Sequence, residues 1–518
     1  MLTHLFRPML LLLVLLLLAG CAAPLTYAEV QATAQVTGCW PDPFPTPRAV
    51  TVTPADSGPV EPPLPTTTPY PRCPPAPGAT QVPWPTPVPN PPPYPTMEPR
   101  PWQGGSDQQT TLFLPSNVLT IDLATHPTER WAAVGAVVWS GNRDPERAFV
   151  SVYHPQSRVW SPAHQVDIGP SQLGRYSRTV AVAISGDRTV HAVWGMSDPD
   201  FRDNDPPSGI WAGSSTDFGT SWSPPLRIAS DCRRVNDLAA TLDGTLVAQL
   251  ICNDGPDRSV PALVVRRPDG TWLPPERLPI PAWYFSEGSL VIVGEGDDAR
   301  AVGILFAGQG GLPMAYLISK RLADAGPWHV EARPIVAPGG ELGERMWHVR
   351  GLVFERPSGD PQPAPGIIFT WTDAEAGGAY ALTSLDGGLS WGPVERIAAP
   401  QHAGEQLAFV APAYDPAADR LVAVWTCCAF ALFATPETTH YASWSVPGSG
   451  VWRPGTDAAR VPLVFGARSA FETVIAQARN SRSGWIAWIE RQQRVELRSF
   501  ELNQIVPVDQ YQLPGGQP

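Results

Sequence analysis

The pattern S-x-D-x-G-x-x-W occurs twice in this chain of 518 residues, as Ser215-Thr216-Asp217-Phe218-Gly219-Thr220-Ser221-Trp222 and as Ser384-Leu385-Asp386-Gly387-Gly388-Leu389-Ser390-Trp391. A proline and a short apolar segment follow each copy. In such a turn the serine and aspartate side chains bond local backbone, and a glycine adopts a positive φ. We therefore expect a structural role for Ser215, Asp217, Gly219, Trp222, Ser384, Asp386, Gly388 and Trp391. Because the pattern recurs, it also indicates a fold built from repeated units.

Tryptophans recur at a regular spacing beyond residue 104. They lie 50 to 63 residues apart, at Trp160, Trp222, Trp272, Trp328, Trp391 and Trp452. All but Trp328 are followed two residues later by a proline. Short runs of Val, Ile, Ala and Trp, bounded by Gly, Asp and Pro, precede each of them, and such runs are typical of β-strands. Four strands in a period of this length are typical of one blade of a β-propeller.

The sequence thus predicts an all-β fold, a β-propeller of four-stranded antiparallel blades over residues 105–510, with almost no helix. Six tryptophans favour six blades, but the inner hairpins number seven, the last running from Phe471 to Glu490. We favour seven blades, with six as the alternative. The seventh blade lacks the tryptophan, and we expect Thr110 to Leu114 to complete it, because closing the ring removes exposed sheet edges. Residues 511–518 are predicted to form a disordered tail.

The two copies of the pattern resemble the Asp box, or BNR repeat, of the sialidase-like β-propellers. The resemblance rests on these two copies and on Pro268-Asp269-Gly270-Thr271-Trp272, a shortened relative. In that family the boxes lie on the face away from the active site. The resemblance therefore implies that any chemistry lies on the other face, near the axis, where loops enter the inner strands and leave the second strands.

The resemblance also implies a set of residue types for hydrolysis of a sialoside. Three arginines would bind the sugar carboxylate through their planar guanidinium forks, a glutamate would activate a tyrosine nucleophile, and an aspartate would act as acid and base. This set differs from the usual pair of glycosidase carboxylates. The candidate catalytic residues in the loops of the expected face are Arg178, Arg234, Arg345 (or Arg350), Tyr284, Glu287 and Asp198.

Two features separate this chain from the family pattern. The arginine-isoleucine-proline motif of the first blade is absent, since the corresponding segment, Leu114-Pro115-Ser116-Asn117-Val118, has no arginine. Tyr284 and Glu287 share one loop, whereas in the family the two come from different parts of the chain. The alternative is that these polar groups are solvated loop residues, so the sequence leaves it open whether the chain is an enzyme.

The first residues predict export. Arg7 precedes an apolar run from Met9 to Leu18, which ends in Leu18-Ala19-Gly20-Cys21. These features are typical of a signal peptide, here residues 1–20, and the alternative is a membrane-spanning helix. Leu-Ala-Gly-Cys resembles a bacterial lipobox, which implies lipidation of Cys21. A lipid anchor would hold the protein at the outer face of the cell membrane or cell envelope.

Residues 21–104 are predicted to form an extended tether. About four residues in ten between Pro41 and Pro101 are proline. Such a segment favours polyproline II, because it can neither bury a core nor pair as strands. At ~3.1 Å per residue, sixty residues reach about 150 to 190 Å. The alternative is a proline-rich ligand for a recognition domain.

Six cysteines follow Cys21. Cys232 precedes one inner strand and Cys252 ends the second strand of the same hairpin, so we expect a disulfide between them in an exported protein. We expect Cys39 and Cys73 to clamp part of the tether, and the adjacent Cys427 and Cys428 to be a buried thiol pair.

An acidic segment, Asp198 to Asp205, contains the oxygen ligands that Ca²⁺ prefers. Arg202 lies within it and the EF-hand spacing is absent, so we expect a solvated loop. The histidines are scattered without metal-ligand spacing. The sequence therefore predicts neither a metal nor a cofactor.

Charge and aromatic content restrict the partners. A net charge of −12 argues against nucleic acid as a partner. Trp283, Trp347 and Trp371 are expected near the axial face, where an aromatic ring stacks on a sugar or anchors a protein partner. Three functions remain: a surface-tethered monomer that binds a glycan or an envelope protein, a sialidase-type glycoside hydrolase, and a scaffold for an envelope complex. We favour the first, because no catalytic set is complete.

Overall fold

The structure is a computed structural model that describes residues 110–502 apart from gaps at 115–116, 140–145, 168–175, 198–208, 255–258, 281–283, 310–311, 336–345, 358–363, 374–376, 401–406, 428–438, 454–460, 463–469, 480 and 491–493. The predicted signal peptide, the tether, Cys21 and the predicted tail lie outside the described residues. The described strands fall within one compact unit. Within the described residues, no helix has the length and hydrophobicity needed to cross a membrane.

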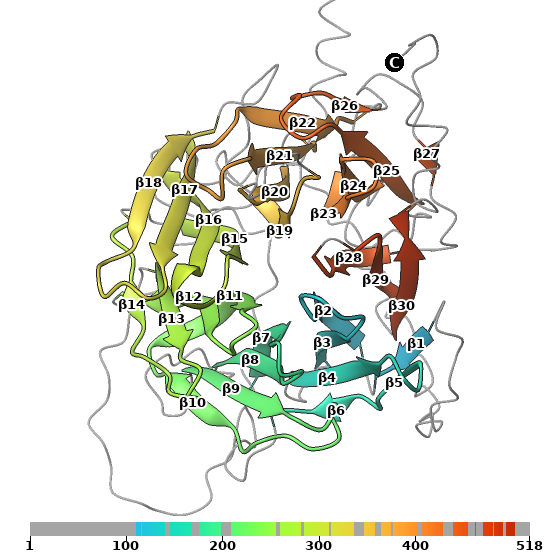
Figure 1. Cartoon of the computed structure of the whole chain (residues 1–518). Helices are drawn as coiled ribbons and strands as arrows, with labels where there is room; N and C mark the ends of the chain where they lie inside the picture. Colours follow the sequence, from blue (N-terminus) through green and yellow to red (C-terminus); the bar gives the residue numbers. More distant parts are fainter. Residues whose placement is uncertain are drawn as a thin grey trace, which may run out of the picture. The chain divides into compact units, whose positions relative to one another are not determined.

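The fold is all-β, with seven antiparallel sheets arranged around a central axis (Figure 1). This arrangement confirms the predicted propeller and the choice of seven blades over six. Five sheets have four strands, and two have a fifth short strand. In the part of the chain that the structure describes, helical structure amounts to the short 3₁₀ helix η1 (Gly296–Asp298) and a single further helical residue, Leu502.

The strands occupy equivalent positions in each blade. The innermost strands are β2 (Asn117–Thr125), β7 (Tyr176–Ile184), β11 (Cys232–Ala240), β15 (Tyr284–Val293), β19 (Met346–Phe354), β23 (Leu407–Asp415) and β28 (Ala470–Gln477). The second strands are β3 (Ala132–Trp139), β8 (Val190–Ser197), β12 (Leu246–Asn253), β16 (Arg300–Gln309), β20 (Gly366–Asp373), β24 (Arg420–Cys427) and β29 (Ser483–Glu490). The third strands are β4 (Arg147–His154), β9 (Gly209–Ser215), β13 (Ser259–Arg266), β17 (Leu312–Arg321), β21 (Ala379–Ser384), β25 (Thr439–Ser445) and β30 (Arg494–Glu501).

The outer strands are short. They are β5 (Val159–Trp160), β10 (Leu226–Ala229), β14 (Glu276–Arg277), β18 (His329–Pro334), β22 (Val394–Ala398), β26 (Trp452–Arg453) and, in the seventh blade, β1 (Thr110–Phe113). The additional strands β6 (His164–Gln165) and β27 (Val461–Pro462) pair with β4 and β25. We number the blades 1 to 7 in the order of their inner strands.

The ring closes through the two ends of the propeller sequence. β1 pairs with β30 in an antiparallel register from Thr110↔Leu497 to Phe113↔Arg494, and the two strands lie side by side in Figure 1. The segment expected to complete the seventh blade therefore does so. Thr111 adds a side-chain bond, since its hydroxyl donates to Glu496 at 2.8 Å. Closure satisfies the outer edge of β30, which would otherwise expose unpaired backbone groups.

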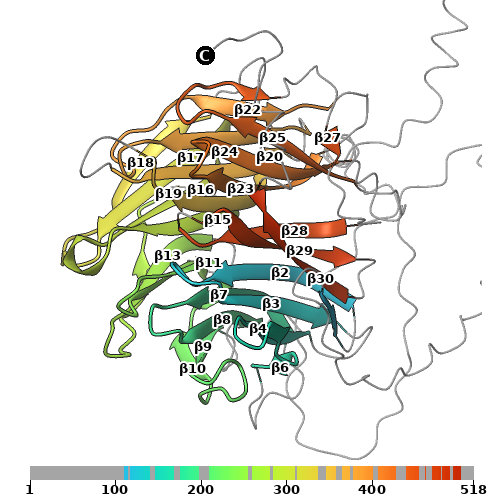
Figure 2. The ribbon, with the colours of Figure 1, turned by 45° about the vertical axis from the view of Figure 1, so that its right-hand side comes forward.

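Apolar side chains fill the interfaces between neighbouring blades. The described residues form seven hydrophobic clusters, each shared by two successive blades, and Figure 2 shows successive sheets packing face to face. Both faces of the second strands are covered, as in β20, where all eight residues of the sequence GIIFTWTD are buried.

The regularly spaced tryptophans share one structural role. Each packs, at or near the outer strand of its blade, into the interface with the preceding blade: Trp160, Trp222, Trp272, Trp328, Trp391 and Trp452. Trp160, for example, is 1% exposed and meets Trp485 of blade 7 edge-to-face, with 5.0 Å between ring centroids. The tryptophans thus recur every 50 to 63 residues because each of the first six blades packs one of them against the preceding blade.

Both S-x-D-x-G-x-x-W segments form tight turns between a third and an outer strand. The Asp217 Oδ1 atom accepts from the backbone N–H of Ser221 at 2.9 Å, and the Ser215 hydroxyl accepts from the N–H of Gly219 at 2.8 Å. Gly219 has a φ of +80°, and a Cβ there would lie 2.9 Å from Val152. Ser384 and Asp386 make the corresponding bonds. Hydrogen bonds from Ser221 lower the pKa of Asp217 to about 2.

We predict that ring closure contributes strongly to stability. Leu112 of β1 is 4% exposed and packs between blades 7 and 1, so Leu112→Ala should lower the free energy of unfolding by about 3 kcal/mol. Urea unfolding followed by tryptophan fluorescence measures this change. The matched control is Leu389→Ala, since Leu389 is 70% exposed, and its effect should stay within about 0.5 kcal/mol. Equal effects of the two substitutions would contradict the role assigned to β1.

Candidate functional site

The inner strands form the edges of their sheets, so part of their backbone faces the axis without a strand partner. Buried N–H groups of this kind need an acceptor. A side chain of the adjacent blade provides it at several interfaces. The bonds are Val182 N–H to Asp122 (2.8 Å), Val235 N–H to Thr179 (3.0 Å), Leu290 N–H to Asp237 (2.8 Å), His348 N–H to Glu287, Tyr414 N–H to Gln477 (2.8 Å) and Ile121 N–H to Glu472 (2.9 Å).

Each of the seven inner strands contains a bulge near its beginning. The registers shift, for example, between Phe285 and Gly288 in β15 and between Trp347 and Arg350 in β19. A bulge turns side chains out of the normal alternation. In β19 the bulge places His348 at a φ of +56°, where its N–H reaches Glu287. We call the end of the ring at which the inner strands begin the axial face.

Six ionisable side chains meet around the axis and form what we call the axial cluster. They are Asp122, Arg234, Asp237, Glu287, Arg350 and Glu472, from blades 1, 3, 4, 5 and 7. Arg350 interacts electrostatically with all four carboxylates, and its Nη2 atom lies 3.5 Å from Glu472. Arg234 lies 3.5 Å from Glu287 of the next blade. The cluster thus links blades that are far apart in the sequence.

Burial and neighbouring charges shift the pKa values of the acids in the axial cluster in different directions. Burial raises the pKa of Glu472 to about 7 and that of Asp122 to about 6, although Arg350 opposes both shifts. Burial alone would raise the pKa of Glu287 as well, but interactions with His348, Arg234 and Arg350 outweigh it, and the pKa is lowered overall. Burial lowers the pKa of His348 to about 4. At neutral pH His348 is therefore uncharged, while Glu287 is ionised.

An aromatic row lies beside the axial cluster. It consists of Trp347, His348 and Phe409, from blades 5 and 6. The rings of His348 and Phe409 have centroids 3.9 Å apart, and those of Trp347 and His348 lie 6.3 Å apart. Phe409 is buried, whereas Trp347 is 42% exposed. A tryptophan that is exposed beside partly buried charged groups offers an apolar surface next to hydrogen-bonding partners.

The structure brings together two of the predicted catalytic residues. Arg234 and Glu287, expected in separate roles, form an ion pair. Arg350, the alternative to Arg345, also lies in the cluster. The structure describes the backbone of Arg178 and Tyr284 in β7 and β15 but not their side chains, and Arg345 and Asp198 lie outside the described residues.

One aromatic expectation is wrong. Trp371 is fully buried between blades 4 and 5, where it packs near Phe306 at 5.1 Å between centroids, so it offers no surface for stacking. It lies within the second strand β20, which is covered on both faces. Trp347 is exposed as expected, and Trp283 lies outside the described residues.

Asp122 was not among the predicted site residues, because those residues were sought in loops and Asp122 lies inside strand β2. The signal was present: Asp122 stands among apolar residues in β2, NVLTIDLAT, and Asp237 has the same sixth position in β11, CRRVNDLAA. A charged residue inside an apolar strand requires a partner. In both cases the partner is the backbone of the following blade.

The opposite face contains a second cross-axis contact. Arg479, in the turn after β28, donates to Glu295 at 3.0 Å and to the carbonyl of Ile292 at 2.8 Å, so it links blade 7 to blade 4. Third strands run parallel to inner strands, so Ser215 and Ser384, at the ends of β9 and β21, also lie on this face. The S-x-D-x-G-x-x-W turns are therefore remote from the axial cluster.

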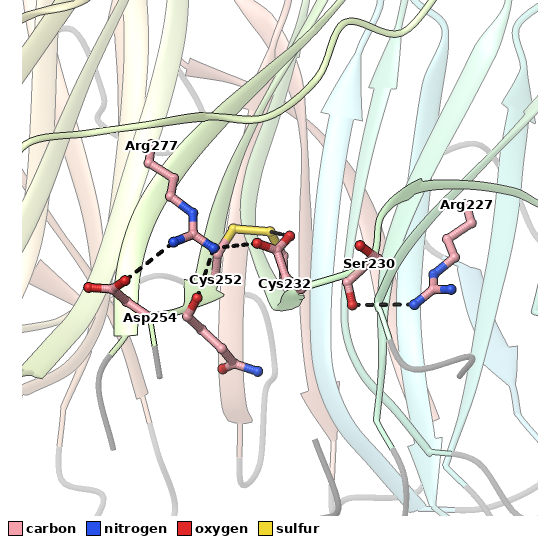
Figure 3. Close-up of a disulfide and its surroundings, with 8 residues drawn as sticks. Arg227, Ser230, Cys232, Cys252, Asp254 and Arg277 are labelled. Atoms are coloured by element: carbon pink, nitrogen blue, oxygen red, sulfur yellow. Dashed lines mark hydrogen bonds and ion pairs between the residues drawn. A yellow bond between two sulfur atoms is a disulfide. The ribbon is translucent and has the colours of Figure 1, made fainter. Parts of the chain in front are cut away.

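Cys232 and Cys252 are joined by a disulfide at the beginning of β11 (Figure 3). The two residues are directly paired across β11 and β12. Arg277 contacts three residues that flank the disulfide in the chain. It pairs with Asp231, lies 3.3 Å from Asp254 and donates to the Asn253 carbonyl at 3.0 Å. Asp231 and the two sulfur atoms lie close enough to hold a metal, but sulfurs joined in a disulfide are not thiolate ligands.

Comparisons with known proteins find remote structural similarity. No protein-family model matches the sequence, and no curated protein matches it either. Among solved structures, the chain is similar to NanB sialidase from Streptococcus pneumoniae, with 9% identity over 77% of this chain and 71% of that chain and a TM-score of 0.42. It is also similar to a PL25 ulvan lyase, with 11% identity, 77% and 93% coverage and a TM-score of 0.46.

A third similarity is to the Aleuria aurantia lectin, described as a six-bladed β-propeller. Here the identity is 11%, the coverage is 68% of this chain and 97% of that chain, and the TM-score is 0.37. Each of these similarities is too remote to assign an activity to the chain.

We predict that Glu472 makes stability depend on pH. The folded-state pKa, about 7, lies above the ordinary glutamate value of 4.5, so the stabilisation is fully present below pH 4.5 and is lost as the pH rises through 7. Glu472→Gln keeps an acceptor for Ile121 but does not titrate. The free energy of unfolding of the wild type, relative to this variant, should therefore fall between pH 5 and pH 8 in urea titrations. A difference that stays constant across this range would contradict the burial assigned to Glu472.

Proposed function

We propose that this chain is an exported lipoprotein whose propeller binds a glycan at the axial face. The observation that carries the proposal is the exposed Trp347 beside the axial cluster. Sugar rings have apolar faces that suit an indole ring, and their hydroxyl groups both donate and accept hydrogen bonds. The aromatic row and the axial cluster together offer both kinds of partner.

Trp347 is connected to the axial cluster through its neighbour in the chain, His348. Trp347 precedes His348, whose N–H donates to Glu287, and Glu287 pairs with Arg234. The Arg234 side chain is 39% exposed and that of Glu287 is 24% exposed. We propose that a ligand stacked on Trp347 also reaches this acceptor and this donor. Binding sites of this composition, with a few polar groups beside an aromatic surface, are typical of small-molecule and glycan ligands.

The amino-terminal sequence supports the location that we propose. A signal peptide over residues 1–20, a lipidated Cys21 and a proline-rich tether would present the propeller away from the membrane surface. An anchored domain on a long tether suits a ligand that is itself fixed outside the cell, such as a polysaccharide.

The ion pair between Arg234 and Glu287 favours binding over hydrolysis. In a sialidase-type reaction the arginine would bind the substrate carboxylate and the glutamate would activate the nucleophile. Here the two neutralise each other, and Glu287 also accepts from the backbone of blade 5.

We predict that Trp347→Ala weakens glycan binding about tenfold, because an aromatic stacking contact contributes about 1.4 kcal/mol. The detergent-solubilised full chain would be screened on a glycan array, and the affinity for a bound glycan then measured by titration calorimetry. Trp347→Tyr should retain most of the affinity, and Leu389→Ala, on the opposite face, should retain all of it. Unchanged affinity in Trp347→Ala would place the binding site elsewhere, and no binding by the wild type would overturn the proposal.

We predict that Cys21 is acylated. Expression in bacteria with an alkyne-bearing fatty acid, followed by fluorescent coupling, should label the wild type and not Cys21→Ala. Cys39→Ala is the matched control and should be labelled like the wild type. Label that persists in Cys21→Ala would rule out the lipid anchor at this residue.

A further inference from the structure

We infer that the axial face selects sugars that lack a carboxylate. The inference rests on the proposed function and names the class of ligand. It runs against the resemblance to sialidase-like propellers, whose substrates carry a carboxylate. Its basis is the pairing of the described arginines of the axial cluster.

Both guanidinium groups of the cluster already have carboxylate partners. Arg234 lies 3.5 Å from Glu287, and Arg350 lies 3.5 Å from Glu472. Arg350 also lies within the electrostatic range of Asp122 and Asp237. A carboxylate on an incoming sugar would therefore meet two guanidinium groups whose charge is already offset by protein carboxylates. The protein carboxylates are held in place by bonds to backbone N–H groups of Ile121 and His348, so they cannot turn away without leaving those groups unpaired.

The charge balance of the cluster points the same way. It contains four carboxyl groups, Asp122, Asp237, Glu287 and Glu472, against two guanidinium groups, Arg234 and Arg350. His348 adds no positive charge at neutral pH, because burial lowers its pKa to about 4. Even with Glu472 half protonated at its pKa of about 7, the described cluster stays negative. Like charges brought together in a partly buried site repel each other more strongly than in water.

Hydroxyl groups suit this cluster better than carboxylates. A carboxylate is an acceptor and has no proton to donate when ionised, whereas a sugar hydroxyl donates to Glu287 or another acid of the cluster. Hydrogen bonds from a neutral donor to a charged acceptor are among the stronger ones. The exposed Trp347 then binds the apolar face of the same ring. Recognition of a neutral sugar therefore uses the cluster as the structure has it, without breaking an ion pair.

The test compares matched glycans. The detergent-solubilised full chain is applied to an array that carries neutral oligosaccharides beside the same oligosaccharides with a terminal sialic acid or glucuronic acid. The wild type should bind the neutral members at least tenfold more tightly. Tighter binding of the acidic members would overturn this inference while leaving glycan binding intact. Binding of no member would overturn the proposed function and the inference with it.

A charge-neutral variant sharpens the test. Glu287→Gln keeps an acceptor for the His348 N–H but frees Arg234, so the preference for neutral over acidic glycans should shrink several-fold. Glu472→Gln removes the ion-pair partner of Arg350 and should act in the same direction, which covers the case in which one variant fails to fold. The matched control is Glu295→Gln, which neutralises an acid paired with an arginine, Arg479, on the opposite face; it should leave the preference unchanged. Equal preferences in wild type, Glu287→Gln and Glu472→Gln, each with a cooperative thermal transition, would contradict the role of these ion pairs.

Discussion

The backbone of the seven inner strands is the constraint on which the rest of the ring depends. Each inner strand is the edge of its sheet, and its free N–H groups point toward the neighbouring blade or the axis. Where packing of the blades buries these groups they need an acceptor, and side chains of the neighbouring blade provide it. Asp122, Thr179, Asp237, Glu287 and Glu472 each accept from the blade that follows. The polar centre of the propeller is therefore part of what holds the blades in order.

This requirement explains why so many carboxylates lie together, and it also sets the chemistry of the site. An acid that satisfies a neighbouring N–H cannot move freely, and a group of such acids needs positive charge nearby. Arg350 and Arg234 supply it, and their own positive charge is offset in return. A site built in this way is well suited to hydroxyl groups and poorly suited to another carboxylate. The selectivity that we propose thus has the same origin as the arrangement of the blades, namely the packing of the inner strands.

Much of the fold could be predicted because the interfaces between blades leave a pattern in the chain. Trp160 and its five counterparts are large enough to be recognised, and each fills the same position against the preceding blade. The closing strand was predictable for a related reason: a seventh hairpin without an outer strand has an edge to satisfy, and Thr110–Phe113 satisfies it. The error over Trp371 shows the limit, since alternation along a strand does not reveal whether both of its faces are covered.

The sequence by itself determined the class of fold and the residues that separate the blades, because repeated packing requires the same side chains at a regular spacing. It favoured seven blades over six, and the structure decided between them. It also indicated that polar residues near the beginnings of inner strands would meet. Only the tertiary structure decided which of them pair. Arg350 and Glu472 lie 122 positions apart in the chain, and their contact depends on bulges in two strands and on the closure of the ring. Ion pairing across an axis depends on distances between blades, and a local sequence pattern contains no information about those distances.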